Sequence, residues 1–172
     1  MGFSPGPLYS APMPLAPQEI RTYFITPVTA SRRRLFQVES NALLLLDHLQ
    51  KQRSKGRMDI HAFVVMPDHV HLLLTPADDV SLEKAMQFIK GGFSFRLKSR
   101  VDVWERSYDS RRIMDADGFM ARVRYIHQNP VEEVLVREAG MFPYSSMGRD
   151  ESVDPIPRHF AESNQSPGLK PL

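Results

Sequence analysis

Aromatic and β-branched residues gather in four short runs, and each run predicts a strand. The first run covers residues 21–29. Residues 58–66 and 68–75 form two further runs that meet at Pro67-Asp68, a pair typical of a tight turn. A fourth strand is expected within residues 101–113. The pattern therefore predicts four strands, with the second and third joined as a hairpin.

Apolar residues recur with helical spacing in three other segments. The first helix is predicted over residues 39–53 and the second from Ser81, a favourable N-cap, to about residue 97. Gly91-Gly92 interrupts the apolar stripe of the second helix, which indicates a helix break or a close approach of another backbone. A third helix is expected over residues 117–128, because the residue before Pro130 avoids helical angles.

The order strand-helix-strand-strand-helix-strand, followed by an extra helix, predicts an α+β fold. It is the ferredoxin-like, split βαβ pattern: an antiparallel sheet with helices on one face and the first and third strands in its centre. The extra C-terminal helix carries Tyr125.

Composition predicts one domain flanked by irregular segments. Residues 1–18 contain five prolines and predict a disordered leader, residues 19–147 a single domain, and residues 148–172 a disordered tail without hydrophobic periodicity. No apolar run approaches the roughly 20 residues that span a bilayer, and no secretory signal or membrane partner is expected.

Charge and cysteine content narrow the classes of function. The chain has no cysteine, which excludes disulfides and thiolate chemistry and fits a reducing cytoplasm. Residues 21–124 carry 18 of the 22 Lys and Arg residues but only 12 of the 20 Asp and Glu residues. A basic body of this kind suits a phosphate-rich partner, although a solvated surface would also explain it.

The third strand carries a candidate metal site. Because side chains alternate along a strand, His69 and His71 share a face with Leu73, and Val70, Leu72 and Leu74 share the other, apolar face. The two imidazoles lie roughly 7 Å apart along the strand and form a ready pair of ligands for one divalent metal ion. Two half-exposed histidines without a metal remain the alternative. Asp68 could orient His69 or simply make the turn, and the turn is the favoured role.

The last predicted helix carries a phenol and an amide close together. Tyr125 and Asn129 are four residues apart and therefore neighbours on the helix surface, with Tyr125 outside the apolar stripe. On the open sheet face, this helix would bring an amide oxygen and a phenol to the histidine pair. Such a three-ligand site suits Mg²⁺ or Mn²⁺, and the tyrosine would attack phosphorus.

Two motifs together resemble a known family. Met66-Pro67-Asp68-His69-Val70-His71 and Tyr125-Ile126-His127-Gln128-Asn129-Pro130-Val131 are similar to the hallmarks of single-tyrosine HUH transposases, closest to the REP-associated tyrosine transposases of bacteria. The similarity runs from Arg21 to Met147 and includes Trp104-Glu105-Arg106 and Phe142-Pro143-Tyr144-Ser145-Ser146.

The resemblance implies a metal-dependent single-stranded DNA endonuclease and strand transferase that acts at hairpins through a 5′-phosphotyrosine intermediate. Tyr125 would be the nucleophile, and His69, His71 and Asn129 would hold Mg²⁺ or Mn²⁺. Gln128 is the rival third ligand, because related insertion-sequence enzymes use a glutamine one turn after the tyrosine. The protein would be a monomer or homodimer in the cytoplasm, associated with the nucleoid. Basic residues near the second helix and fourth strand would hold DNA phosphates: Lys90, Arg96, Lys98, Arg100, Arg111 and Arg112.

Two other classes of function compete with this interpretation. A nucleotide hydrolase of the histidine-triad type needs a third alternating histidine, and Leu73 occupies that position. A non-catalytic, domesticated hairpin-binding protein would keep the fold without turnover, and only an assay of DNA cleavage separates it from the enzyme. The remaining histidines, His48, His61, His127 and His159, are expected to be structural or on the surface.

Overall fold

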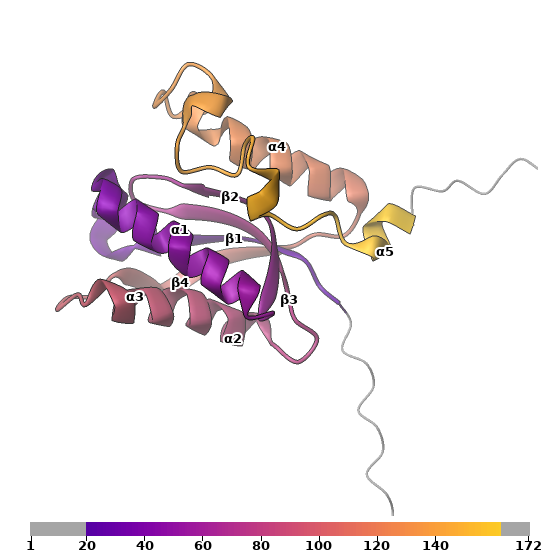
Figure 1. Ribbon diagram of the computed structural model, residues 1–172, viewed down its shortest axis with the longest axis horizontal. Helices are drawn as coiled ribbons and strands as arrows, with labels where there is room; N and C mark the ends of the chain where they lie inside the picture. Colours follow the sequence, from indigo (N-terminus) through magenta and orange to yellow (C-terminus); the bar gives the residue numbers. More distant parts are fainter. Residues whose placement is uncertain (1–19, 163–172) are drawn as a thin grey trace, which may run out of the picture.

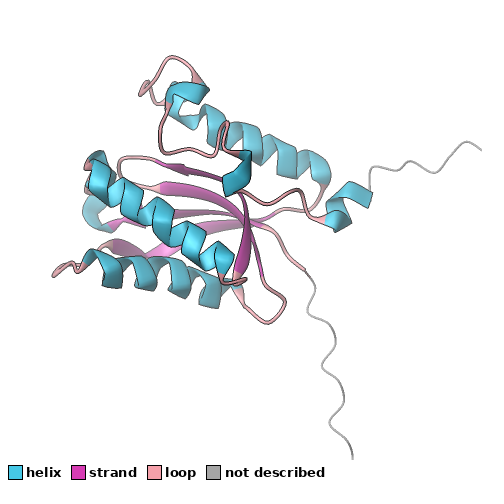
Figure 2. Cartoon of the chain, in the orientation of Figure 1, coloured by secondary structure: helices cyan, strands magenta, loops and turns pink. Residues whose placement is uncertain are grey.

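The computed structural model describes residues 20–162, which form one four-stranded sheet with helices on both faces (Figures 1 and 2). The predicted leader at residues 1–18 and the last ten residues lie outside the described part. The main elements follow in this order: β1 (Tyr23–Thr29), α1 (Glu39–Ser54), β2 (Met58–Val65), β3 (Val70–Pro76), α2 (Leu82–Met86), the π-helical turn η3 (Gln87–Gly91), α3 (Gly92–Leu97), β4 (Trp104–Arg112), α4 (Ala116–Glu132) and α5 (Arg158–Ala161).

The sheet has the order β2-β3-β1-β4, and all its neighbouring strands are antiparallel. The first and third strands are therefore central, as the sequence predicted, and the ferredoxin-like α+β fold is confirmed. Each central strand has a hydrogen-bonded neighbour on both sides, which leaves β3 little freedom to shift its register.

The two faces of the sheet bury different cores. Val70, Leu72 and Leu74 pack under α1 and the α2–α3 layer, together with Leu45 and Phe93. On the opposite face, α4 covers Leu73 and Phe24 through Phe119 and Ile126 (Figure 1). The alternation predicted for β3 is thus confirmed, and its histidine face is the one that α4 covers.

Helix α4 continues past the predicted stop. The sequence placed its end at Gln128, but Pro130 lies inside the helix and the last helical residue is Glu132. Proline removes one donor and disfavours helical angles in the residue before it, yet tertiary packing can outweigh this cost. Here Pro130 is buried, and its carbonyl accepts a hydrogen bond from the Leu135 N–H at 2.9 Å. The extra turn keeps Asn129 helical.

The predicted disordered tail differs from the structure over residues 148–162. The segment 144–154, here called the strap, lies along the outer edge of β2. The Asp154 N–H donates to the Ile60 carbonyl at 2.7 Å, and the Asp154 carboxylate accepts from Arg53 Nε at 2.9 Å. Further along, Phe160 is buried beneath α4. Hydrophobic periodicity could not predict that this segment is ordered, because the strap forms hydrogen bonds with the edge of a distant strand and has no periodic apolar face of its own.

The glycine pair marks a close approach at one of its two residues. A Cβ on Gly92 would lie 2.6 Å from His48 Cε1, whereas a Cβ on Gly91 would meet nothing within 4 Å. The imidazole of His48, on α1, pairs with the Phe88 carbonyl at 2.9 Å beside the π-helical turn. Gly92 therefore lets α1 and α3 pack together around a buried histidine. Among residues 20–162, no helix has the length and apolarity required to cross a bilayer.

Candidate functional site

The histidine pair lies where β3 begins, on the face covered by α4. His69 forms an isolated bridge with Val28, and His71 is opposite Val64 in the β2–β3 ladder. The ring centroids of the two imidazoles are 4.8 Å apart. His71 is only 6% exposed. The alternation of the strand and the packing of α4 together place both imidazoles in one sheltered position.

Each imidazole has its Nδ1 atom engaged by a neighbouring side chain. His69 Nδ1 donates to Asp68 Oδ1 at 2.7 Å, and His71 Nδ1 pairs with Thr26 Oγ1 at 2.9 Å. Such partners orient an imidazole and leave its Nε2 atom for a metal ion. Asp68 therefore orients His69 as well as making the turn, the role that the sequence had offered as the less favoured alternative. Thr26 had no sequence signal, because only the β1–β3 pairing brings it to His71.

The electrostatics favour the neutral form of His71 and the ionised form of Asp68. Burial, together with the nearby charges of His69 and Arg122, lowers the pKa of His71 from 6.5 to about 3. The neutral form is the one that binds metal ions. Partial burial would raise the pKa of Asp68, but its hydrogen bond to His69 and the charges of His69 and Arg32 outweigh this and lower it.

Tyr125, on α4, lies against the histidine pair. Its ring centroid is 5.3 Å from that of His71 and 5.8 Å from that of Phe24. The side chain is 38% exposed, so the phenol contacts the site and remains open to solvent. The Arg122 guanidinium lies over the Phe24 ring at 4.7 Å and over the Tyr125 ring at 5.8 Å. Sequence reasoning missed Arg122, although its position three residues before Tyr125 was a usable signal.

The two candidates for a third metal ligand, Asn129 and Gln128, differ in burial. Asn129 is 4% exposed, and its Oδ1 is buried without a hydrogen-bond partner. Gln128, in contrast, is exposed. An unpaired buried carbonyl oxygen is costly and calls for an explanation. A hard divalent cation would satisfy it, so the donor set of His69, His71 and Asn129 fits Mg²⁺ or Mn²⁺. Within residues 20–162, no three His, Cys, Asp or Glu side chains form an alternative metal cluster.

Two of the six predicted DNA-binding residues are engaged in tertiary contacts. Lys90 Nζ donates to the Glu105 carbonyl at 2.7 Å, and Arg96 forms an ion pair with Asp47 at 2.6 Å. Both belong to the layer on the sheet face opposite the histidine pair. Lys90 therefore connects the helical layer to β4, and Arg96 connects α3 to α1.

The other predicted basic residues are exposed. Lys98 and Arg100 lie on the loop between α3 and β4, at the end of the sheet that also carries His69. On β4, Arg111 is opposite Phe24 and shares its face, whereas Arg112 is opposite Tyr23 on the other face. The structure thus places Arg111, but not Arg112, on the face of the histidine pair.

A basic turn that the sequence-based assignment left out borders the site. Residues 32–34 are all arginines between β1 and α1. Arg32 Nη1 is 3.5 Å from Asp68 Oδ2, and Arg34 lines a small cavity together with His69. Their position at the site depends on the contact of this turn with Pro67 and Asp68, which a local pattern cannot reveal.

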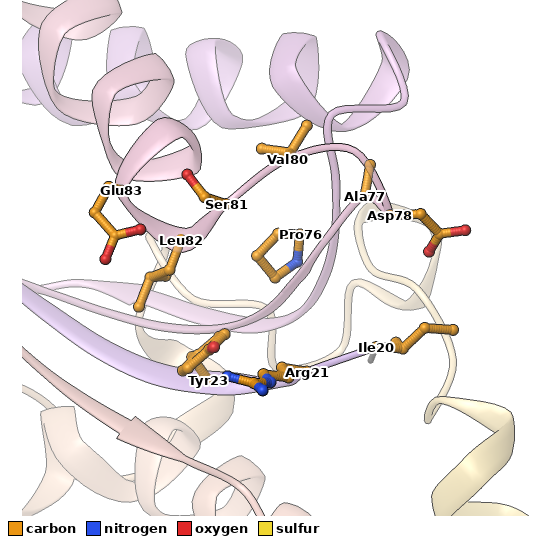
Figure 3. Close-up of a pocket in the computed structure, with 10 residues that line it drawn as sticks. All are labelled: Ile20, Arg21, Tyr23, Pro76, Ala77, Asp78, Val80, Ser81, Leu82 and Glu83. Atoms are coloured by element: carbon orange, nitrogen blue, oxygen red, sulfur yellow. The ribbon is translucent and has the colours of Figure 1, made fainter. Parts of the chain in front are cut away.

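A separate cavity lies away from these residues. It has a volume of about 500 Å³ and is lined by the start of β1, the end of β3 and the start of α2 (Figure 3). Since His69 precedes β3 and Pro76 ends it, this cavity is at the opposite end of the strand. None of the predicted site residues lines it.

Comparisons with known proteins found similarity to transposases. The model of the family described as "Transposase IS200 like" matches residues 20–129. A REP-associated tyrosine transposase of Escherichia coli K12 is 26% identical over 130 residues, which cover 75% of this chain and 78% of that protein. A solved structure of a REP-associated tyrosine transposase bound to a REP hairpin has a TM-score of 0.69 at 22% identity, covering 85% of this chain and 89% of that one. The last comparison supports the fold.

Proposed function

The chain belongs to the IS200-like transposase family, and on this premise we propose that it is a metal-dependent single-stranded DNA endonuclease and strand transferase. Its substrate would be a hairpin or palindromic repeat with unpaired flanks. Tyr125 would be the nucleophile, and the reaction would pass through a 5′-phosphotyrosine intermediate. Support for the hairpin comes from the similar transposase that was solved in complex with a REP hairpin.

One observation carries this proposal: a solvent-accessible phenol contacts a sheltered histidine pair, and the same helix buries an unpaired amide oxygen one turn further on. Tyr125 contacts His71, His71 contacts His69, and Asn129 lies one helical turn after Tyr125. All four residues belong to the same chain, so one copy supplies the complete constellation. This favours a tyrosine that acts beside its own histidines, whether the protein is a monomer or a homodimer.

The proposed reaction follows from the chemistry of these groups. His69 and His71 through Nε2, and Asn129 through Oδ1, would hold the divalent cation, which when bound would polarise a phosphoryl oxygen. Tyr125 loses its proton and Oη forms a bond to phosphorus. The bond from phosphorus to the 3′ oxygen breaks, and that oxygen takes up a proton. Because a phenol, with a pKa near 10, is a better leaving group than an alcohol, a free 3′ hydroxyl can reverse the step and join strands.

Exposed basic residues around the site would hold the DNA strand. Arg111 shares the face of the histidine pair, and Lys98 and Arg100 are at the same end of the sheet. Arg32 and Arg34 lie beside Asp68 and His69. Contacts from such residues to phosphates would make binding strongly salt-dependent and independent of sequence.

The test is covalent capture of DNA. A labelled single-stranded hairpin with unpaired flanks is incubated with Mn²⁺ and either wild-type protein or Tyr125→Phe, and adducts are separated on a denaturing gel. Tyr108→Phe is the matched control, since Tyr108 packs against the core on the opposite sheet face. We expect an adduct with wild type and with Tyr108→Phe, lost with Tyr125→Phe or with chelator.

Two outcomes would contradict the proposal in different ways. Hairpin binding without any adduct would leave the non-catalytic DNA-binding protein as the correct function. An adduct that persists in Tyr125→Phe would show that another residue is the nucleophile.

A further inference from the structure

Arg122 is a cation beside Tyr125 to which the proposed function gives no role. It is half-buried on α4 and precedes Tyr125 by three residues. Its guanidinium carbon lies 4.7 Å from the centre of the Phe24 ring and 5.8 Å from that of the Tyr125 ring. Phe24 in turn stacks on His71, with the two ring centroids 5.3 Å apart. Arg122 therefore belongs to the same group of packed side chains as the phenol and the buried imidazole.

The charge of Arg122 has no partner of opposite sign among residues 20–162, whereas nearby Arg32 pairs with Asp68. The contacts of Arg122 with the two rings are cation–π contacts, which use its charge and occupy none of its N–H donors. A positive charge beside a pair of imidazoles that bind a metal ion is unfavourable until an anion enters. The arrangement therefore favours an anionic group next to the phenol.

The guanidinium suits the phosphoryl group at which Tyr125 would react. During phosphoryl transfer, negative charge is spread over the non-bridging oxygens of the phosphorus. The planar fork of arginine matches two such oxygens and stays protonated at all working pH values. Stabilisation of this kind is strongest where water is excluded, and the neighbouring Phe24 and His71 are only 4% and 6% exposed.

We propose that Arg122 is a catalytic residue whose guanidinium donates hydrogen bonds to the non-bridging oxygens of the scissile phosphate. The inference rests on the proposed function and adds a cation that the protein itself supplies. As the bond from Tyr125 Oη to phosphorus forms and the bond from phosphorus to the 3′ oxygen breaks, Arg122 neither gains nor loses a proton. Because the contact strengthens in the transition state, its loss lowers the rate of adduct formation more than the affinity for DNA.

The test separates the rate of the chemical step from binding. The single-turnover rate constant of adduct formation is measured with Mn²⁺ and saturating labelled hairpin, and the Kd is measured by fluorescence anisotropy without metal ion. Arg122→Met keeps an apolar stem over Phe24 but removes the charge and the donors. It should lower the rate constant about 10²–10³-fold, the usual loss for one such electrostatic contact, and change the Kd much less. Arg122→Lys, which keeps the charge without the planar fork, should fall between Arg122→Met and wild type.

Arg124→Met is the matched control, because Arg124 is exposed on the same helix and carries the same charge. It should keep the wild-type rate constant at saturating DNA. Equal losses in Arg122→Met and Arg124→Met would mean a general effect of charge and would overturn the inference.

A methylphosphonate at the scissile position tests whether Arg122 acts on the phosphate or only on the packing of Phe24. The substitution replaces one non-bridging oxygen by a methyl group and removes the negative charge. The ratio of the wild-type rate constant to that of Arg122→Met should then fall by at least about tenfold for one of the two diastereomers, because coupled groups do not contribute additively. An unchanged ratio for both diastereomers would assign the loss to packing and would overturn the inference.

The inference and the proposed function fail in distinguishable ways. If Arg122→Met forms adducts at the wild-type rate, the inference is wrong and the proposed function stands. If wild type forms no adduct on the unmodified hairpin, the proposed function is wrong and the role of Arg122 is wrong with it.

Discussion

Asn129 offers a test in which stability and metal binding respond in opposite directions. Its buried Oδ1 has no hydrogen-bond partner, and an unsatisfied buried polar group costs about 1–3 kcal/mol. Leucine has the same branched shape without the polar oxygen. In the presence of EDTA, Asn129→Leu should therefore raise the free energy of unfolding by about 1–3 kcal/mol. For a chain of this length, each kcal/mol raises Tm by roughly 2–4 °C.

Adding Mn²⁺ should reverse the order of the two proteins. At a metal concentration about 100 times the Kd, binding stabilises the wild type by about 2.7 kcal/mol. Asn129→Leu keeps only the two imidazoles and should gain much less. Thermal unfolding followed by circular dichroism, with and without Mn²⁺, measures both effects on the same samples. Gln128→Leu is the control, and its exposed position predicts a change within about 0.5 kcal/mol and an unaltered response to Mn²⁺.

Two results would refute this reasoning. A Tm for Asn129→Leu below that of wild type in EDTA would mean that Oδ1 has a partner in solution. A full response to Mn²⁺ in Asn129→Leu, with the response lost in Gln128→Leu, would identify Gln128 as the third ligand.

Two further predictions concern the scaffold. Gly92→Ala should lower the free energy of unfolding by about 1–3 kcal/mol, because the new Cβ would overlap the buried His48 ring. Gly91→Ala should instead raise the free energy of unfolding by up to about 1 kcal/mol, because its Cβ meets nothing. Similar shifts of Tm in both variants would contradict this prediction. Burial lowers the pKa of His61, so below about pH 6.5 the unfolded chain binds more protons than the folded chain. The free energy of unfolding should therefore fall on acidification, by up to about 1.4 kcal/mol per pH unit for this residue. Urea unfolding at pH 7.5 and 5.5 in EDTA measures the loss, which should be smaller in His61→Gln; an equal loss in that variant would assign the effect to other groups.

The sequence alone determined the two faces of β3 and the pairing of Tyr125 with Asn129. Both follow from local periodicity: strand side chains alternate, and residues four apart on a helix are neighbours. The apolar face of Val70, Leu72 and Leu74 specified which side of β3 packs against α1 and the α2–α3 layer. His69 and His71 were thereby placed on the other side of the strand. These relations survive in the fold because they depend only on backbone geometry within one element.

Only the tertiary structure decided which polar groups surround the histidines. Thr26, Asp68 and Arg122 act on the imidazoles and the phenol through strand pairing, the turn and the packing of α4. Lys90 and Arg96 belong to the helical layer on the sheet face opposite the histidines, although their charge made them equal candidates with Arg111 in the sequence. The strap and the extra turn after Pro130 were missed for the same reason. The strap is held by hydrogen bonds to β2 and α1, far away in the chain, and the extra turn keeps Pro130 buried, so both depend on packing about which a local pattern contains no information.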